Sequence, residues 1–267
     1  MMNRVTIITV NFNNRTGLEH TIKSVVQQGF PDLEYIVIDG ASTDGSVDVI
    51  RQYADKISFW KSEPDRGIYD AMNKGIRRAT GEYVLFLNSG DYFTDSNILK
   101  RVFETDCNRA DLIVGRQKYI DRVSGRKGKS PSLHVDEMNI QFFLSSTLPH
   151  QATFIRRDLF DRCGMYDETY RVSADWVFWV KAVVEQRCCV KIIPYYISFM
   201  EAGGVSTDME KCHNDMKRYL EECMRKGTLT WNDLFEMSIK SRKQDFCQRT
   251  RFTGIINRVI IWIGKHK

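Results

Sequence analysis

Short apolar runs alternate with segments of helical spacing along the first ninety residues, and this alternation restricts the folds open to the chain. The runs at 5–10 (VTIITV), 34–39 (EYIVID) and 83–87 (YVLFL) have strand length and little polar interruption, as in strands buried on both faces. Residues 17–28 and 68–79 lie between them and carry apolar side chains at helical spacing. Strands joined by single helices form βαβ units. We therefore predict an α/β fold with a Rossmann-like, mostly parallel sheet flanked by helices.

Polar residues follow three of these strands, at 11–14, 39–44 and 88–91. In parallel sheets, ligands bind beyond the carboxyl ends of the strands, so these segments should meet at one rim. Asp91 could there hold a hard cation together with a phosphate-bearing ligand. The pair Gly90-Asp91 is equally ordinary in a turn, and taken alone the residues leave both interpretations open.

Two common nucleotide motifs do not fit the sequence. Residues 128–130 (GKS) end like a Walker A loop, but Val123 stands where that loop needs its first glycine. No Gly-x-Gly-x-x-Gly follows either of the first two strands, which disfavours a dinucleotide-dependent dehydrogenase.

Charge and cysteine usage restrict the partners and the compartment. The chain carries +5, and residues 240–267 hold eight Lys/Arg against a single acid, so the remaining body is close to neutral. Such a body offers no basic face for nucleic acid. Seven cysteines without a Cys-x-x-Cys pair indicate reduced thiols in a cytoplasmic protein. No signal peptide is evident, and no run approaches the ~20 apolar residues of a membrane span.

The C-terminal region has its own pattern. Apolar side chains at helical spacing are flanked by basic ones; the apolar set is Phe252, Ile255, Ile256, Val259, Ile260 and Ile263. This pattern is typical of a basic amphipathic helix on an anionic membrane surface. It is also typical of a helix packed on its own domain or on a second subunit. Because the charge excess is so local, we favour a membrane contact through 249–267, on the inner face of the plasma membrane.

The second half is less regular. It predicts a hairpin around 124–125, strands at 151–155 and 190–193, and helices at 137–144, 173–185 and 209–226. We expect one body over 1–228, with halves 1–115 and 116–228, followed by a helical region over 229–267.

The order of three segments, VTIITVNFNN, EYIVIDGASTDGS and EPDRGIYDAMNKGIRRATGEYVLFLNSGD, resembles the family 2 glycosyltransferases of the GT-A fold. The later segments HQATFIRR, SADWVFW and GGVST fit the acceptor half of the same family. In particular the chain resembles bacterial colanic-acid and exopolysaccharide enzymes, over residues 3 to about 210. The resemblance implies an inverting, Mn²⁺- or Mg²⁺-dependent transfer of sugar from a nucleotide sugar, with a UDP-sugar favoured. The acceptor would be a glycan or lipid-linked oligosaccharide of cell-surface polysaccharide biosynthesis.

The same resemblance implies roles for single residues. Nucleotide-sugar contacts would come from Val10, Phe12, Asp39, Asp65, Gly67, Asn88, Ser89 and Gly90. Asn73 would brace the loop of Asp65 and Gly67, and Asp91 would bind the metal. His150, Gln151 and Trp176 would lie on the acceptor side. Asp175 would be the catalytic base, although without the family it is equally a residue favoured in a helix's first turn by the macrodipole.

The sequence departs from the family pattern at four positions, Gly40, Met72, Asn88 and Ala174, where the family commonly has Asp, Arg, Asp and Glu. Gly40 leaves open which nucleotide base the site would recognise. Asn88 leaves Asp91 as the sole carboxylate of its motif. Arg66 and Lys74 are candidates to assist the diphosphate in place of the missing arginine. The glycine pair at 203–204 suits either a loop that closes on the donor or an ordinary turn. Two other functions stay open: a nucleotidyltransferase, or a catalytically silent glycan- or nucleotide-binding protein on the same fold.

Overall fold

The computed structural model describes residues 4–105, 107, 110–121, 125, 127–130, 132–134, 138–202 and 209–227. The predicted helical region 229–267, including the proposed membrane segment 249–267, lies outside these residues, as does the glycine loop at 203–206. The division of the chain at 228 therefore stays a prediction.

The first half forms the predicted parallel sheet. Its strands are β1 (Val5–Asn11), β2 (Leu33–Asp39), β3 (Phe59–Ser62) and β4 (Tyr83–Phe86). They lie in the order β3-β2-β1-β4, and all three neighbouring pairs are parallel. The intervening helices are α1 (Arg15–Val26), α2 (Ser46–Gln52) and α3 (Ile68–Arg78), with a short 3-10 turn, η1, at Ala54–Lys56.

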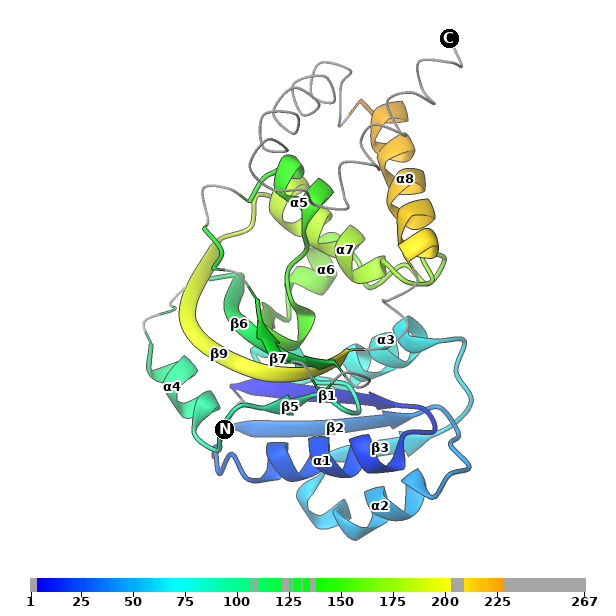
Figure 1. Cartoon of the computed structure of the whole chain (residues 1–267), viewed down its shortest axis with the longest axis vertical. Coiled ribbons are helices and arrows are strands. Elements are labelled where there is room, and N and C mark those ends of the chain that lie inside the picture. Colours follow the sequence, from blue (N-terminus) through cyan, green and yellow to red (C-terminus); the bar gives the residue numbers. More distant parts are fainter. Residues whose placement is uncertain are drawn as a thin grey trace.

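The second half extends this sheet beyond β4 with strands of mixed direction. The strands are β5 (Tyr92–Phe93), β6 (Leu112–Asp121), β7 (Lys127–Lys129), β8 (Thr153–Arg156) and β9 (Val190–Ala202). β8 pairs antiparallel with both β4 and β6, while β9 runs parallel to β6 and pairs with β5 at the edge. The sheet curls so that β5 comes to lie beside α1 (Figure 1).

The predicted strand at 190–193 is only the start of β9, which runs to Ala202. The sequence pattern stops at Pro194, because proline cannot donate to a ladder. In the structure the register against β6 jumps from Ile192 to Tyr196, so Pro194 lies in a bulge. The bulge bends the strand without ending it.

Two hydrophobic cores cover the two faces of the sheet. Alternate residues of β1 point to opposite faces, so Ile7 joins the core beneath α1 and α2 while Ile8 joins the other. The second core is covered by α3 together with α5 (Ile140–Ser145), α6 (Leu159–Cys163), α7 (Ala174–Trp179) and α8 (Met209–Arg225). Figure 1 shows α5 to α8 together on the side of the sheet opposite α1 and α2. A π-helical segment, η4 (Val180–Glu185), continues α7. The 3-10 turn η3 (His150–Ala152) precedes β8, and the helix α4 (Ile98–Glu104) follows β5.

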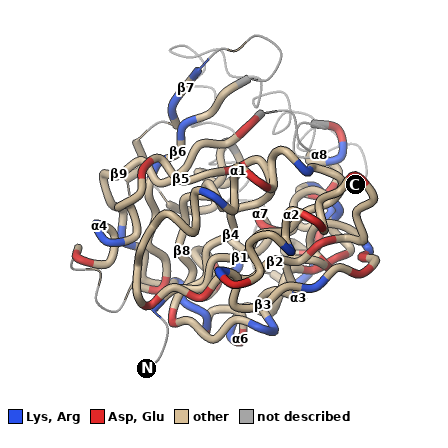
Figure 2. Tube along the Cα trace, turned by 90° about the horizontal axis from the view of Figure 1, so that it is seen from below, with Lys and Arg blue, Asp and Glu red and all other residues tan. Residues whose placement is uncertain are grey.

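Basic and acidic residues are interspersed along most of the described chain, but β6 and β7 carry basic residues side by side (Figure 2). Within the described residues, no helix is both long and apolar enough to cross a membrane.

Candidate functional site

The three polar strand ends meet at one rim, as the sequence predicts. Asn11 Nδ2, at the end of β1, donates a hydrogen bond to Asp39 Oδ1, at the end of β2, over 2.7 Å. Asn14 Nδ2 donates to the carbonyl of Ser89, beyond β4, over 3.0 Å. The segments after β1, β2 and β4 are thus tied to one another directly.

Asp39 is fully buried and organises the loop after β2. Its Oδ1 accepts from Ser42 Oγ at 2.6 Å, besides the bond from Asn11. Its Oδ2 accepts from the Ser42 amide at 2.9 Å and from Ser62 Oγ at 2.6 Å. A carboxylate held by four donors keeps the rim in one conformation.

The glycine at position 40 is required by a close approach of two side chains. A Cβ added to Gly40 would lie 2.5 Å from Asp65 Oδ2 and 3.2 Å from Phe12 Cδ2. The carboxylate of Asp65 therefore occupies the space that an aspartate at 40 would need. The Phe12 ring is 65% exposed beside it, and Val10 is buried at the end of β1.

Asp65 is fixed by the start of α3. Its Oδ1 accepts from the Gly67 amide at 2.9 Å. Gly67 has φ +127°, a conformation that residues with a Cβ rarely adopt, which explains the glycine at this turn. Asp65 and the exposed Phe12 thus lie against Gly40, which directly follows the buried Asp39.

The segment 88–91 is held by Thr21, a buried residue of α1 that sequence reasoning missed. Thr21 Oγ1 donates to the Asp91 carbonyl at 2.6 Å and accepts from the Gly90 amide at 3.0 Å. The sequence feature that could have pointed to Thr21 is its position as a polar residue on the apolar face of a predicted helix. The Asp91 side chain is only 6% exposed, and burial raises its pKa to about 7. The charge of His150 and a hydrogen bond with Gln151 oppose that rise in pKa, whereas the charge of Glu201 adds to it.

The donor atoms at this segment suit a hard divalent cation. Asp91 supplies a carboxylate, and the buried Oδ1 of Asn88 has no hydrogen-bond partner among the residues that the structure describes. Oxygen donors of this kind are the ligands that Mg²⁺ and Mn²⁺ prefer. Among the described residues no cluster of three or more His, Cys, Asp or Glu could hold a metal by itself. A cation here would need further oxygens from a bound phosphate group and from water.

Asp175, at the start of α7, faces this segment through a histidine. Its Oδ1 accepts from Tyr69 OH at 2.8 Å and from the Trp176 amide at 2.9 Å, and its Oδ2 lies 3.3 Å from His150 Nδ1. Burial raises the pKa of Asp175, but the interactions with His150, Tyr69 and the Trp176 amide outweigh it and hold the pKa below the usual value. The carboxylate is therefore ionised at neutral pH.

The second nitrogen of His150 reaches the metal motif. Asn88 Nδ2 lies 3.3 Å from His150 Nε2. When the ring is neutral, Nε2 accepts from this amide nitrogen, which leaves the ring proton on Nδ1, facing Asp175. His150 thus connects the predicted base to the predicted metal and donor motif.

The two other residues predicted on the acceptor side, Gln151 and Trp176, are buried. Gln151 is buried against Asp91. Trp176 is only 5% exposed, its Nε1 donates to the Phe143 carbonyl at 2.6 Å, and its ring packs edge-on against Tyr219. Trp176 therefore supports the position of Asp175 from within the core, and its contact with an acceptor stays a prediction.

Asn73 braces the loop at Tyr166, whereas the resemblance implies a contact with the loop of Asp65 and Gly67. Its Nδ2 donates to the Tyr166 carbonyl at 2.8 Å, and its Oδ1 accepts from the Tyr166 amide at 3.1 Å. The two cations proposed to replace the missing arginine already have acidic partners. Arg66 pairs with Asp70 and Glu168, and Lys74 pairs with Asp70 and Glu63.

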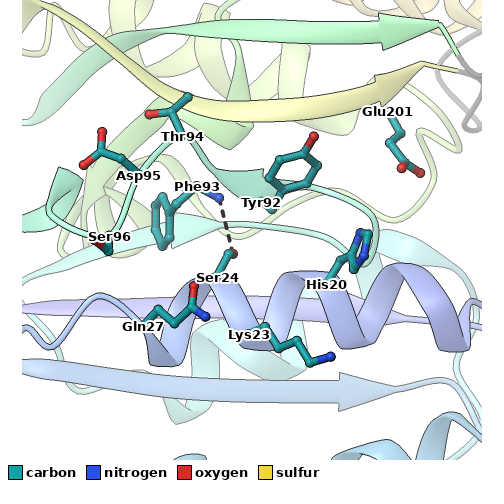
Figure 3. Close-up of a pocket in the computed structure, with 10 residues that line it drawn as sticks. All are labelled: His20, Lys23, Ser24, Gln27, Tyr92, Phe93, Thr94, Asp95, Ser96 and Glu201. Atoms are coloured by element: carbon teal, nitrogen blue, oxygen red, sulfur yellow. Dashed lines mark hydrogen bonds between the residues drawn. The ribbon is translucent and has the colours of Figure 1, made fainter. Parts of the chain in front are cut away.

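A groove of about 470 Å³ opens between α1 and β5 and is drawn in Figure 3. Glu201 and His20 line one end of it, and Gln27, Asp95 and Ser96 line the other (Figure 3). Since α1 starts at the rim, the end with His20 is the one nearer to Asp91. The backbone of Glu201 also hydrogen-bonds the Asp91 carboxylate, so this residue links the groove to the site. Sequence reasoning missed Glu201, because the predicted strand stopped before it.

Comparison with protein families gives one match that covers more than half of the chain. The profile described as glycosyl transferase family 2 matches residues 6–164, which contain Asp39, Asp65, Asn88 and Asp91.

Two bacterial relatives extend the likeness. An uncharacterised glycosyltransferase of Mycobacterium tuberculosis strain H37Rv is 34% identical over 193 residues, which cover 67% of this chain and 69% of the relative. A PGL/p-HBAD biosynthesis glycosyltransferase of Mycobacterium bovis strain BCG is 30% identical over 206 residues, covering 75% and 78% of the two chains.

Two solved structures share the fold. Residues 1–349 of S. aureus TarS, in complex with UDP-GlcNAc, match with a TM-score of 0.70 at 18% identity, over 93% of this chain and 74% of that one. The mannosyltransferase PcManGT of Pyrobaculum calidifontis, in complex with GDP-Man and Mn²⁺, matches with a TM-score of 0.64 at 15% identity, over 100% of this chain and 76% of that one. The predicted GT-A fold is confirmed. No comparison singles out the colanic-acid enzymes.

Proposed function

Because this chain belongs to glycosyl transferase family 2, we propose that it transfers a sugar, with inversion, from a nucleotide sugar to a glycan or lipid-linked acceptor. The observation that carries the proposal is the connection from Asp175 through His150 to Asn88. It joins an ionised carboxylate, suited to accept a proton, to a motif suited to bind a diphosphate and its cation.

Asp175 is the proposed base. Tyr69 and the Trp176 amide fix one carboxylate oxygen, and the other has only the longer contact to His150. That second oxygen takes the proton of the acceptor hydroxyl as the hydroxyl oxygen bonds to the anomeric carbon. The bond from that carbon to the diphosphate breaks on the opposite face. Attack from the opposite face inverts the anomeric configuration.

The donor site lies beside Phe12 and Asp65, on the rim that the buried Asp39 organises. An exposed ring next to the Asp65 carboxylate suits a nucleobase, with stacking on the ring and a hydrogen bond to Asp65. We propose a UDP-sugar as donor. The TarS complex with UDP-GlcNAc supports a uridine nucleotide, and the PcManGT complex with GDP-Man makes a guanosine nucleotide the alternative to test.

A Mn²⁺ or Mg²⁺ ion bound beside the diphosphate would supply positive charge to the leaving group. Asp91 and the unpartnered Oδ1 of Asn88 are the residues that would hold it. The Mn²⁺ in the PcManGT complex supports this part of the proposal. Since Asp91 and Asn88 are the two ligands identified among the described residues, we expect the cation to bind weakly without the donor.

The acceptor belongs, we propose, to cell-surface polysaccharide or glycolipid biosynthesis. The relative in PGL/p-HBAD biosynthesis supports this class of product. A cytoplasmic enzyme that contacts the inner face of the plasma membrane through 249–267 would meet a lipid-linked acceptor there.

A thermal-shift screen of UDP-, GDP- and dTDP-sugars, each with and without Mn²⁺, tests the donor and metal assignments. A bound ligand stabilises the fold by RT ln(1 + [L]/Kd), so the true donor raises Tm most when Mn²⁺ is present. Asp91→Ala should lose the Mn²⁺-dependent part of the shift, and Asp55→Ala, an exposed acid of η1, should keep it. An equal shift in the Asp91 variant would refute the metal assignment. Release of pyrophosphate in place of nucleoside diphosphate would identify a nucleotidyltransferase instead.

A further inference from the structure

Three basic side chains gather around one aromatic ring on the edge formed by β7, β6 and β9. The Arg116 guanidinium lies 4.4 Å from the centroid of the Tyr196 ring, Lys118 Nζ lies 5.3 Å from it, and Lys129 Nζ lies 5.5 Å from it. We call Arg116, Lys118, Lys129 and Tyr196 the basic cluster. Each distance is within the range of a cation–π contact. The ring therefore attracts all three cations to one place.

The like charges of the basic cluster are not balanced by acids. Lys118 and Lys129 stand directly opposite each other on paired strands, a placement that is unfavourable for like charges. In the part of the chain that the structure describes, none of the three cations forms an ion pair with Asp or Glu. The buried Nε of Arg116 also lacks a hydrogen-bond acceptor among the described residues. An anionic group bound at the basic cluster would relieve this repulsion.

A row of aromatic rings leads from the basic cluster to the catalytic rim. Lys118 Nζ lies 5.0 Å from the centroid of the Phe199 ring. Phe199 in turn stacks on Tyr92, with centroids 5.1 Å apart and planes 21° apart. Tyr92 directly follows Asp91 and forms part of the groove in Figure 3. The basic cluster is thus two ring contacts away from the metal motif.

We propose that this surface binds an acidic acceptor glycan, an oligosaccharide whose sugars carry carboxylate or phosphate groups. The basic cluster would bind the anionic groups, while the sugars between the cluster and Asp91 would lie along the stacked pair Phe199 and Tyr92. This inference rests on the proposed function, because it specifies the acceptor of that reaction. Charge complementarity and the direction of the aromatic row, toward the catalytic rim, favour a glycan over a lipid surface.

The test uses the full chain and two probes of equal length, hexagalacturonate and neutral maltohexaose, with binding measured by calorimetry. The wild type should bind hexagalacturonate, lose that binding in 0.5 M salt, and bind maltohexaose at least tenfold more weakly. The double variant Lys118→Ala/Lys129→Ala should bind hexagalacturonate about tenfold or more weakly than wild type, since two charge-assisted contacts are lost. The double variant Lys56→Ala/Lys100→Ala removes the same charge from exposed positions elsewhere and should bind like wild type.

Equal binding of hexagalacturonate by both double variants, or equal binding of the neutral probe by the wild type, overturns the proposal. So does a result in which the cluster variant keeps the glycan and loses only binding to phosphatidylglycerol vesicles. The donor-induced thermal shift is measured on the same samples and should be the same in both variants and wild type. Loss of that shift in wild type would count against the proposed function, whereas a normal shift with no glycan binding counts only against the acceptor assignment.

Discussion

His150 Nδ1 lies 3.3 Å from Asp175 Oδ2, so the side chain that precedes β8 touches the carboxylate at the start of α7. The opposite nitrogen of the same ring is 3.3 Å from Asn88 Nδ2. One imidazole thus spans the distance between Asp175 and the segment 88–91 after β4. From the sequence, the resemblance implies only an acceptor-side position for His150. The geometry suggests a further role, the positioning of Asp175 relative to Asn88.

The first prediction concerns the base itself. Asp175→Asn should lower the rate of sugar transfer by about 10²–10⁴-fold, the usual contribution of a general base, because an amide cannot take the acceptor proton. The asparagine keeps the shape of the side chain and can still accept from Tyr69 and the Trp176 amide. Donor binding and Tm should therefore change little, which separates lost chemistry from lost folding. Transfer at the wild-type rate would remove Asp175 from the mechanism.

The second prediction is a shift in pH dependence. Burial raises the pKa of Asp175, and His150 is the first of the groups that lower it. His150→Gln removes that opposing interaction, so the pKa of Asp175 should rise. Because the base acts as a carboxylate, activity is lost as pH falls through its pKa, and the acid limb of the kcat profile should move to higher pH. His134→Gln, an exposed histidine, is the matched control and should leave the limb in place. An unmoved limb in the His150 variant would mean that His150 does not tune the base.

The parallel first half of the fold follows from local pattern, and its strand ends identify the rim. Continuous apolar runs of strand length, such as 83–87, favour strands buried on both faces, and parallel strands bring their polar ends together. The second half of the fold is harder to predict from the sequence. Its strand β9 contains Pro194 in a bulge, and the residues after the bulge show no regular alternation of apolar and polar side chains. Glu201 and the basic cluster were missed for that reason. The contacts of Tyr69 and Thr21 with the site depend on helix packing, which spacing along the chain does not encode.

The third prediction concerns Gly40. In Gly40→Ala the new Cβ would meet Asp65 Oδ2 at 2.5 Å and Phe12 at 3.2 Å, so Asp65 must move away from its place beside the ring. We expect donor affinity to fall by about tenfold, with a smaller change in the stability of the free protein, because Asp65 is only partly buried. The thermal shift induced by the donor measures this directly.

A double variant separates the clash from the role of Asp65. Gly40→Ala/Asp65→Ala removes the collision and should recover any stability that Gly40→Ala loses, yet its donor binding should stay weak. Full recovery of donor affinity in the double variant would show that the Asp65 carboxylate takes no part in recognition.

The last prediction tests the brace between α3 and the loop at Tyr166. Asn73 is 2% exposed and its side chain exchanges two hydrogen bonds with the Tyr166 backbone. Asn73→Ala leaves a buried amide and a buried carbonyl without partners, and each such group costs roughly 1–3 kcal/mol. We expect the free energy of unfolding, measured in urea, to fall by about 2–3 kcal/mol. Asn97→Ala is the matched control, since the exposed Asn97 begins α4 without a side-chain capping bond, and its cost should stay below about 0.5 kcal/mol. Equal stability of the two variants would mean that the loop is held by the packing of Tyr166 against Phe86 and Phe178 rather than by Asn73.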